Sequence, residues 1–376
     1  MDVPRTLLVT NDFPPKVGGI QRTLQAVARE LPADRVSVFA PSYAGDEAFD
    51  AREPYRVFRR PEGFMWPTRA TLAAVERAIE ETGAEVVLFG DSFPLAGLAP
   101  ALERRGVPSV LLAHGFDYWL SVVPGTHEWL RHVTGSVRRV AVCSEAIARV
   151  VRTSVPRRVP VSVLYPGADA EGFHPDLPTD DIRARHGIGD APLVVCVSRL
   201  VARKGQDVLI RAMPAIRRRV PDAHLLMVGD GTYRPTLEEL ARRAPSGSVH
   251  FAGAVSEADL PRHYAAADVF AMPCRSRYAG FEIEGWGSVF IEAAACGRPV
   301  VVGDSGGARE ALVDGETGTL VRGGDVEQVA TAVADLLADP ERARSMGKAG
   351  RARVESYFTW RRVASQLAGW LREAAA

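Results

Sequence analysis

Two glutamates stand where a purely structural segment would carry no charge. Glu292 lies inside the apolar run 289–296, and Glu284 lies in the glycine-flanked loop before it. Charged side chains are seldom buried unless a partner or a ligand compensates them. Acidic side chains accept hydrogen bonds from ribose hydroxyls in nucleotide sites, so we expect both carboxylates to contact a ligand. The alternative for Glu292 is a helix-dipole role in the first turn, because a capping box from Ser288 would need its acid at Ile291.

Two cations precede a helix that is expected from residue 206. In the stretch VSRLVARKGQDVLIRA, Arg199 and Lys204 lie five positions apart on a glycine-containing loop. Fixed cations beside a helix N-terminus suit a diphosphate, and a guanidinium binds two phosphate oxygens at once. The alternative is a pair of solvated loop charges. Lysine is rare in this chain, which has only Lys16, Lys204 and Lys348, and this favours the diphosphate site.

Glycines and a histidine follow two strands of the first half. Gly18 and Gly19 stand between a strand and a helix expected near Ile20, where backbone N–H groups can approach an anion. The pair is not the G-x-G-x-x-G of dinucleotide folds, and a tight turn explains it equally well. His114 directly follows the apolar run 110–113. From the residues alone, a structural role is favoured for this histidine.

The composition restricts the class of protein. The 376 residues suit two domains, and 46 Lys and Arg balance 46 Asp and Glu. A neutral chain does not favour nucleic-acid binding. Four scattered cysteines predict buried free thiols in a reducing compartment, and they are Cys143, Cys196, Cys274 and Cys296. Without a leader or an apolar run of bilayer length, we expect a cytoplasmic protein, and no motif calls for a metal or a cofactor.

Short aliphatic runs alternate with longer amphipathic runs, which predicts parallel sheets with crossover helices. The expected strands of the first half are 7–10, 36–40, 86–89, 110–113, 140–143 and 162–164. Those of the second half are 193–197, 225–228, 249–251, 269–272, 300–302 and 318–321. The Pro-, Gly- and Asp-rich stretch 165–192 predicts a linker between the halves. Open α/β sheets bind ligands at the carboxyl ends of their strands, so a cleft is expected there.

These motifs occur together in one family. Arg199 and Lys204, the E-x₇-E glutamates, and the segments SGGARE and DGETGTLV resemble the retaining GT-B glycosyltransferases of the large family that includes the phosphatidylinositol mannosyltransferases. The resemblance covers nearly the whole chain. It implies an α/β GT-B fold with two Rossmann-like domains facing a central cleft. The acceptor-binding domain is expected at 1–170, the nucleotide-sugar-binding domain at 171–355, and a C-terminal helix that packs on the first domain at 356–376.

The resemblance implies a role for each candidate in the second domain. Arg199 and Lys204 would hold the donor diphosphate. Glu284 would contact sugar hydroxyls, and Glu292 would contact the nucleotide ribose. Val255 stands at the usual backbone contact with the base. If Glu284 and Lys204 serve ligand and not packing, their substitution should leave the melting temperature unchanged.

In the first domain, the resemblance places Gly19, with Gly18 beside it, near the donor phosphate. It gives His114 a contact with the donor sugar and so reverses the structural reading. The segments NDFPPKVGGIQ and HG…W…VPG resemble most the actinobacterial subfamily that adds the second mannose to phosphatidylinositol monomannoside. The prediction is a retaining mannosyltransferase that uses GDP-mannose, with a lipid-linked or small-molecule acceptor. No D-x-D motif precedes the donor site, so the cations and helix N-termini are expected to stabilise the leaving diphosphate without a metal.

Other functions stay open at this stage. One is a transferase for another nucleotide sugar and a water-soluble acceptor. Another is a GT-B-type sugar-nucleotide epimerase, which would carry further carboxylates and histidines at the cleft. A third is a nucleotide-sugar sensor, which would not turn over its ligand. Release of diphosphate from a nucleotide sugar would discriminate among them.

A lipid acceptor would require contact with an anionic membrane at the inner face of the plasma membrane. The stretch EWLRHVTGSVRR offers Trp129, Leu130 and Val133 beside basic residues, and the nearby arginines are Arg131, Arg138, Arg139, Arg152, Arg157 and Arg158. Such charges near a membrane surface contribute about 1 kcal/mol each. The alternative is a solvated helix face whose apolar side is core.

The last stretch, FTWRRVASQLAGWLREAAA, has the periodicity of an amphipathic helix. We expect Trp360 and Trp370 to provide its buried face.

Overall fold

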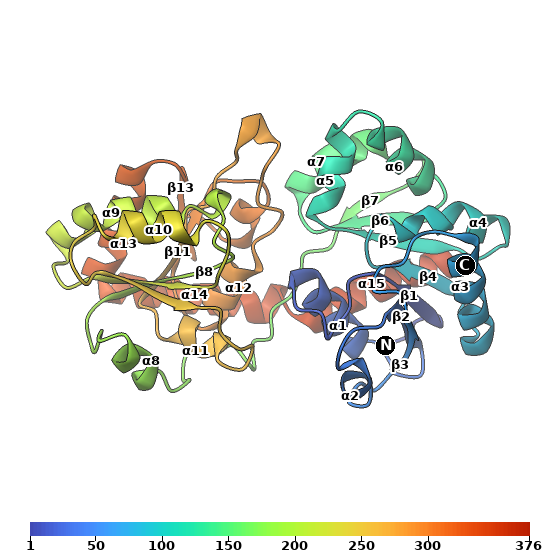
Figure 1. Cartoon of the computed structure of the whole chain (residues 1–376), viewed down its shortest axis with the longest axis horizontal. Helices are drawn as coiled ribbons and strands as arrows, with labels where there is room; N and C mark the ends of the chain where they lie inside the picture. The colour runs from blue at the N-terminus through green and yellow to red at the C-terminus, as the bar shows by residue number, and fades with distance from the viewer. The chain divides into compact units, whose positions relative to one another are not determined.

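The computed structural model describes residues 1–376, which form two compact units. Unit 1 comprises Met1–Pro166 together with Trp360–Ala376, and unit 2 comprises Gly167–Thr359. Each unit is an open parallel sheet with helices packed against it (Figure 1). The predicted α/β class with two Rossmann-like domains is therefore confirmed. The units divide at Pro166 and Thr359, where the sequence placed the boundaries at 170 and 355.

The sheet of unit 1 has seven parallel strands in the order β3-β2-β1-β4-β5-β6-β7. They are β1 Thr6–Val9, β2 Val36–Pro41, β3 Arg56–Arg60, β4 Val86–Phe89, β5 Ser109–Ala113, β6 Arg139–Val142 and β7 Val161–Val163. The sequence missed β3, whose residues RVFRR interrupt the apolar pattern with arginines. Since β3 is an edge strand that pairs only with β2, its charges remain partly exposed and protect the edge.

The central strands of unit 1 are buried on both faces, which explains their continuous apolar runs. On one face, Leu8, Leu88 and Leu112 belong to a core that includes residues of α1 (Gly19–Glu30) and α15 (Trp360–Ala375). The remaining helical segments of unit 1 are α2 Asp46–Asp50, α3 Arg69–Thr82, η1 Leu95–Leu98, α4 Ala99–Arg104, α5 Gly115–Val122, α6 Thr126–Thr134 and α7 Glu145–Ser154.

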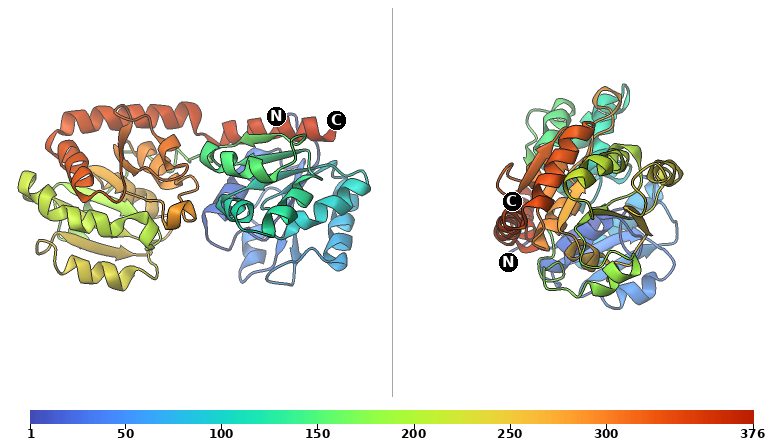
Figure 2. Two further views of the ribbon diagram at one scale, coloured as in Figure 1. Left: turned by 90° about the horizontal axis from the view of Figure 1, so that it is seen from above. Right: turned by 90° about the vertical axis from the view of Figure 1, so that its left-hand side faces the viewer.

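The C-terminal helix α15 packs in the core of unit 1, as the predicted fold requires (Figure 2). Its buried side chains include Leu367 and Leu371, both 0% exposed. Trp360 and Trp370 are only partly buried and pack at the border of this core. Leucines, not the predicted tryptophans, therefore form the centre of the buried face.

The sheet of unit 2 has six parallel strands in the order β10-β9-β8-β11-β12-β13. They are β8 Leu193–Val197, β9 His224–Val228, β10 Val249–Gly253, β11 Val269–Met272, β12 Val300–Gly303 and β13 Gly318–Val321, all at the predicted places. The helical segments are α8 Asp180–Arg185, η2 Ala202–Lys204, α9 Gln206–Arg219, α10 Arg234–Ala241, α11 Leu260–Ala265, η3 Tyr278–Gly280, α12 Ser288–Ala295, η4 Ala308–Ala311, α13 Val326–Ala338 and α14 Pro340–Tyr357. Helix α9 packs beside α13, and α12 packs beside α14.

The prediction of a linker at 165–192 is partly wrong, because α8 lies within these residues and packs on unit 2. Ile182 is 1% exposed, and Arg183 Nη2 lies 3.0 Å from Asp268 Oδ2. One apolar residue among acidic and basic neighbours is too weak a pattern to predict a helix of six residues.

The four cysteines are buried and form no disulfide, which confirms the predicted free thiols. Burial raises the pKa of the Cys196 thiol to about 12, so this sulfur is protonated and unreactive at neutral pH.

Candidate functional site

A tight loop carries the basic residues that follow β8. Gly205 has a φ of +78°, and a Cβ there would collide with the carbonyl oxygen of Pro273. Only glycine fits this position, which ends η2 and begins α9. The close approach places Lys204 in the interior, where it is 8% exposed.

The buried carboxylate of Glu284 joins two cations. Its Oε2 accepts hydrogen bonds from Lys204 Nζ and Arg203 Nη1, each at 2.7 Å. Burial acts to raise the pKa of the Glu284 carboxyl, but attraction by Lys204 and Arg203 outweighs burial and lowers that pKa. The carboxylate is therefore ionised. Arg203, Lys204 and Glu284, here called the Glu284 cluster, hold two positive charges and one negative charge.

The SGG segment after β12 fixes the backbone of Glu284. Ser305 Oγ accepts a hydrogen bond from the Glu284 amide at 3.2 Å, and the Gly307 amide donates to the Glu284 carbonyl at 2.9 Å. Gly306 has a φ of +53°, and a Cβ there would collide with the same carbonyl oxygen. These contacts hold the loop of Glu284 against the end of β12, and they explain why glycine stands at 306.

A second glutamate supports the cluster from its exposed side. Glu282 Oε2 lies 3.0 Å from Arg277 Nη1, and Glu282 Oε1 lies 3.9 Å from Arg203 Nε. Its side chain is 28% exposed, whereas that of Glu284 is 8% exposed. Arg203 thus lies between two carboxylates of unequal burial.

Glu292 faces a buried phenol. The Tyr264 hydroxyl, on α11, donates a hydrogen bond of 2.6 Å to Glu292 Oε2. Tyr264 is 0% exposed and Glu292 is 8% exposed. The N-cap of α12 is Gly287, one residue before the expected Ser288, so a capping box still does not account for this acid. The two glutamates that are eight positions apart therefore contact different partners.

Arg199 and Lys204, which are predicted to hold the diphosphate, differ in burial, and their shared role stays a prediction. Arg199 is exposed and does not contact Glu284, and its carbonyl accepts a hydrogen bond of 2.9 Å from Gln206. The second cation at Glu284 is Arg203, which is not among the residues predicted from the sequence. Its signal is its position directly before Lys204 on the turn that enters α9. Val255 is half-buried on the loop after β10.

Unit 1 gathers acidic residues at the carboxyl ends of adjacent strands. Asp91 follows β4 and Asp117 lies in the first turn of α5, and they are 9% and 2% exposed. Burial raises the pKa of each carboxyl to about 7. Asp91 Oδ2 also accepts a hydrogen bond of 2.9 Å from Thr10 Oγ1. Neither acid is among the residues predicted from the sequence, although both follow strands as His114 does.

His114 directly precedes α5. Its Nε2 donates a hydrogen bond of 3.0 Å to the Gly90 carbonyl. Burial lowers the pKa of His114, so the ring is neutral at pH 7. The hydrogen bond to a carbonyl assigns the proton to Nε2 and leaves Nδ1 as an acceptor.

The glycine pair opens helix α1. Gly18 is its N-cap, and a Cβ at Gly18 would collide with the amide oxygen of Gln21. A Cβ at Gly19 would meet no atom within 4 Å. A side chain at 18 would only displace the end of the flexible Gln21 side chain, so packing requires glycine at neither position. The predicted contact of Gly18 and Gly19 with a phosphate stays a prediction.

No group of three or more His, Cys, Asp or Glu side chains is arranged to hold a metal ion. The transfer without a metal that the sequence predicts stays a prediction.

Two family models match the chain. Residues 17–171 match the model described as Glycosyltransferase Family 4, and residues 178–353 match the model described as Glycosyl transferases group 1. The first match lies mainly in unit 1 and the second lies in unit 2.

Relatives match nearly the full length. The chain is 44% identical over 369 residues to the GDP-mannose-dependent alpha-(1-6)-phosphatidylinositol monomannoside mannosyltransferase of Mycolicibacterium smegmatis, covering 96% of this chain and 97% of that protein. It is 38% identical over 374 residues to the corresponding monoacylated-substrate enzyme of Corynebacterium glutamicum, with 98% of each chain covered. Among solved structures, Anabaena HepE in complex with UDP superposes with a TM-score of 0.82 at 22% identity, covering 98% of this chain and 100% of that chain. At this identity, the similarity shows a shared fold and nothing further.

Proposed function

We propose a mannosyltransferase activity for this chain, which belongs to the Glycosyl transferases group 1 family and has the GT-B fold. The chain transfers mannose from GDP-mannose to a phosphatidylinositol monomannoside acceptor. Identity of 44% across nearly the whole length to a mannosyltransferase of that name carries this conclusion. In our proposal, unit 2 binds the nucleotide sugar and unit 1 binds the acceptor.

The Glu284 cluster supplies the chemistry that we assign to unit 2. A leaving nucleoside diphosphate develops negative charge, and preorganised cations stabilise it. Arg203 and Lys204 exceed Glu284 by one positive charge and are largely buried, and Arg199 adds an exposed guanidinium on the same loop. We propose that these three cations bind the diphosphate, while Glu284 orients Arg203 and Lys204 and contacts sugar hydroxyls. Transfer with retention of configuration is part of the same proposal.

The remaining assignments stay predictions. They are the contacts of Glu292 with the ribose, of Val255 with the base, of Gly18 and Gly19 with the phosphate, and of His114 with the sugar.

The activity is tested with purified protein, GDP-mannose and phosphatidylinositol monomannoside. We expect GDP release that depends on the acceptor, and a product heavier by one hexose in mass spectrometry. UDP-glucose as donor and unmannosylated phosphatidylinositol as acceptor serve as controls. Faster transfer from another nucleotide sugar, or GDP release without a mannosylated product, would contradict the proposal.

For the lipid acceptor, we further propose a peripheral membrane contact through unit 1. No helix in the chain is both long and apolar enough to span a bilayer. Two of the apolar residues predicted for such a contact are wrong, because Leu130 and Val133 are each 1% exposed and belong to the interior. Trp129, the third, is half-buried and its ring lies 5.5 Å from that of Phe93. Two of the predicted arginines are also paired, since Arg139 contacts Glu373 and Arg152 contacts Glu145.

A group of exposed aromatic side chains offers a better contact. Trp66 is 54% exposed, Phe93 is 39% exposed and Phe116 is 55% exposed. Their rings form a connected series, with 5.8 Å between the centroids of Trp66 and Phe93 and 5.9 Å between those of Phe93 and Phe116. A contiguous exposed apolar patch of this kind marks an interaction surface.

Co-sedimentation with vesicles tests this contact. We expect wild type to bind vesicles of phosphatidylglycerol, and Trp66→Ser with Phe116→Ser to bind them at least tenfold more weakly. Tyr278→Ser, which removes a ring that is 68% exposed on unit 2, is the matched control and should bind like wild type. Negligible binding of wild type to both anionic and neutral vesicles would contradict the proposed membrane contact and favour a water-soluble acceptor.

A further inference from the structure

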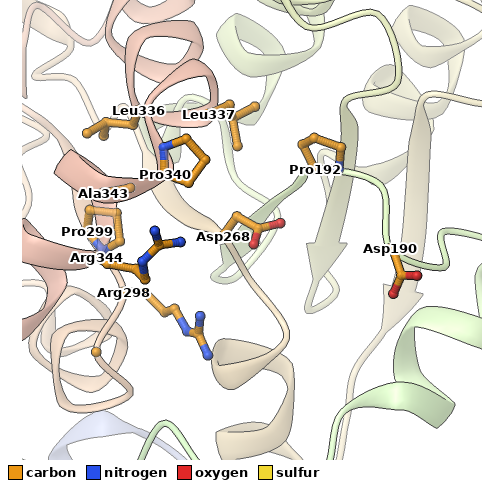
Figure 3. A pocket seen from close by; sticks show the side chains of 11 residues that line it. Asp190, Pro192, Asp268, Arg298, Pro299, Leu336, Leu337, Pro340, Ala343 and Arg344 are labelled. Atoms are coloured by element: carbon orange, nitrogen blue, oxygen red, sulfur yellow. The ribbon is translucent and has the colours of Figure 1, made fainter.

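A cavity of about 240 Å³ lies at the amino-terminal edge of the unit 2 sheet (Figure 3). Pro192, Asp268 and Pro299 line it, and they directly precede β8, β11 and β12. Arg199 and Lys204, in contrast, follow the carboxyl end of β8. In a parallel sheet these are opposite edges, so the cavity is separate from the Glu284 cluster.

One wall of the cavity holds Arg298, which forms no direct ion pair, although the charges of Asp268 and Asp176 act on it from nearby. The Arg298 Nε is buried and has no hydrogen-bond partner. Burial also lowers the pKa of the Arg298 guanidinium. Asp268 lines the same cavity, but its Oδ2 already accepts hydrogen bonds from Arg183 Nη2 at 3.0 Å and the Leu193 amide at 2.8 Å. The buried Nε of this partly buried guanidinium lacks a hydrogen-bond acceptor, which an anionic ligand would supply.

A second cation and an apolar surface line the same space. Arg344, on α14, is exposed and forms no ion pair with another side chain. Leu336, Leu337 and Pro340, from the junction of α13 with α14, form an apolar wall. Figure 3 shows Asp190 on the other side of the space from both arginines, where it would oppose a highly charged ligand.

We propose that this cavity binds a small organic anion. The carboxylate or phosphate group of the ligand contacts Arg298 and Arg344, and its short apolar part contacts Leu336, Leu337 and Pro340. Guanidinium groups bind both kinds of oxyanion in a bidentate manner. The volume corresponds to about eight water molecules, which suits a single ring with its acidic group.

Calorimetric titration with phenyl phosphate, benzoate and inorganic phosphate tests the site. We expect phenyl phosphate or benzoate to bind wild type more tightly than inorganic phosphate does. Arg298→Gln should weaken this binding at least tenfold, and Arg344→Gln should weaken it as well. Arg218→Gln, which removes an equal charge from an exposed site on α9, is the matched control and should bind like wild type.

A substitution at the Glu284 cluster separates the cavity from the proposed donor site. Binding should persist in Lys204→Ala, and saturation with GDP should leave it unchanged. Binding that is lost in Lys204→Ala but kept in Arg298→Gln would assign the anion to the donor site and overturn the proposal. An absence of binding by both organic probes, or equal binding by wild type, Arg298→Gln and Arg344→Gln, would overturn it too.

Discussion

Substitution of Glu284 by glutamine removes the one negative charge that two buried cations share. The variant keeps the size of the side chain and leaves an amide oxygen that can accept one hydrogen bond. Lys204 remains 8% exposed, so its ammonium group stays buried without a counter-ion. Removing one partner of a buried ion pair costs about 3–5 kcal/mol of unfolding free energy. Because the amide oxygen still accepts, we expect the lower end of that range.

This loss of unfolding free energy is large enough to measure as a change in melting temperature. For a domain of 150–250 residues, a loss of 1 kcal/mol lowers the melting temperature by about 2–4 °C. Unit 2 is of this size, so Glu284→Gln should lower its transition by roughly 6–12 °C in ligand-free protein. This result differs from the expectation drawn from the sequence, in which Glu284 and Lys204 serve ligand alone.

Circular dichroism or calorimetry of the ligand-free protein at pH 7 gives the comparison. Glu282→Gln is the matched control, because this glutamate also pairs with arginine but its side chain is 28% exposed. Its loss should stay below about 1 kcal/mol, as is usual for exposed pairs. A melting temperature of Glu284→Gln within about 2 °C of wild type would refute the reasoning.

The pH dependence gives a second check. The folded pKa of Glu284 is lowered, so its contribution is complete above the unfolded pKa of about 4.3 and is lost as the pH falls through the folded pKa. The difference in folding stability between wild type and Glu284→Gln should therefore become smaller as the pH is lowered. A difference that stays constant from pH 7 down to the acid transition would mean that the charge of Glu284 is not its source.

Three further predictions follow from the described contacts. The pKa of Asp117 is raised to about 7, so folding stability falls as the pH rises from about 4 to 7. In urea unfolding, Asp117→Asn should be more stable than wild type by up to about 4 kcal/mol at pH 8. Near pH 4 the two proteins should be equally stable. Leu371→Ala should lower the unfolding free energy by about 2–5 kcal/mol in the same assay. Trp370→Ala should lower it less, because Trp370 is only partly buried, and the reverse order would contradict the packing of α15. Lys204→Ala should lower kcat/KM for mannose transfer by hundreds-fold, and retention of most activity would remove this residue from the donor site.

The strands could be predicted because buried parallel strands have a simple pattern. In β8 and β11 every residue is buried, so the apolar run begins and ends with the strand. Strand β3 could not be predicted, since an edge strand with three arginines lacks this pattern. Helix α8 was missed for a related reason: Ile182 is its single buried residue, and Arg183 anchors it by hydrogen bonds that leave no periodicity in the sequence.

The site could be predicted by residue type but not by pairing. The sequence identified Lys204 and Glu284 as candidate site residues. It could not show that they contact each other, because 80 positions separate them. Nor could it choose between Arg199 and Arg203 as the second cation at Glu284. That choice depends on the turn η2 and on Gly205, whose positive φ sets the direction in which the chain enters α9.

The same contacts that bury the Glu284 cluster also preorganise it. Ser305 and Gly307 hold the backbone of Glu284, and Glu284 in turn holds the two cations, so each charge is positioned before any ligand arrives. Preorganised charges stabilise a leaving group better than mobile ones, since no water or side chain must reorient during the reaction. A cluster with one more cation than anion can gain a second anion without a change of protonation. Folding stability and the proposed stabilisation of the diphosphate therefore depend on the same three side chains, and a substitution of Glu284 should reduce both.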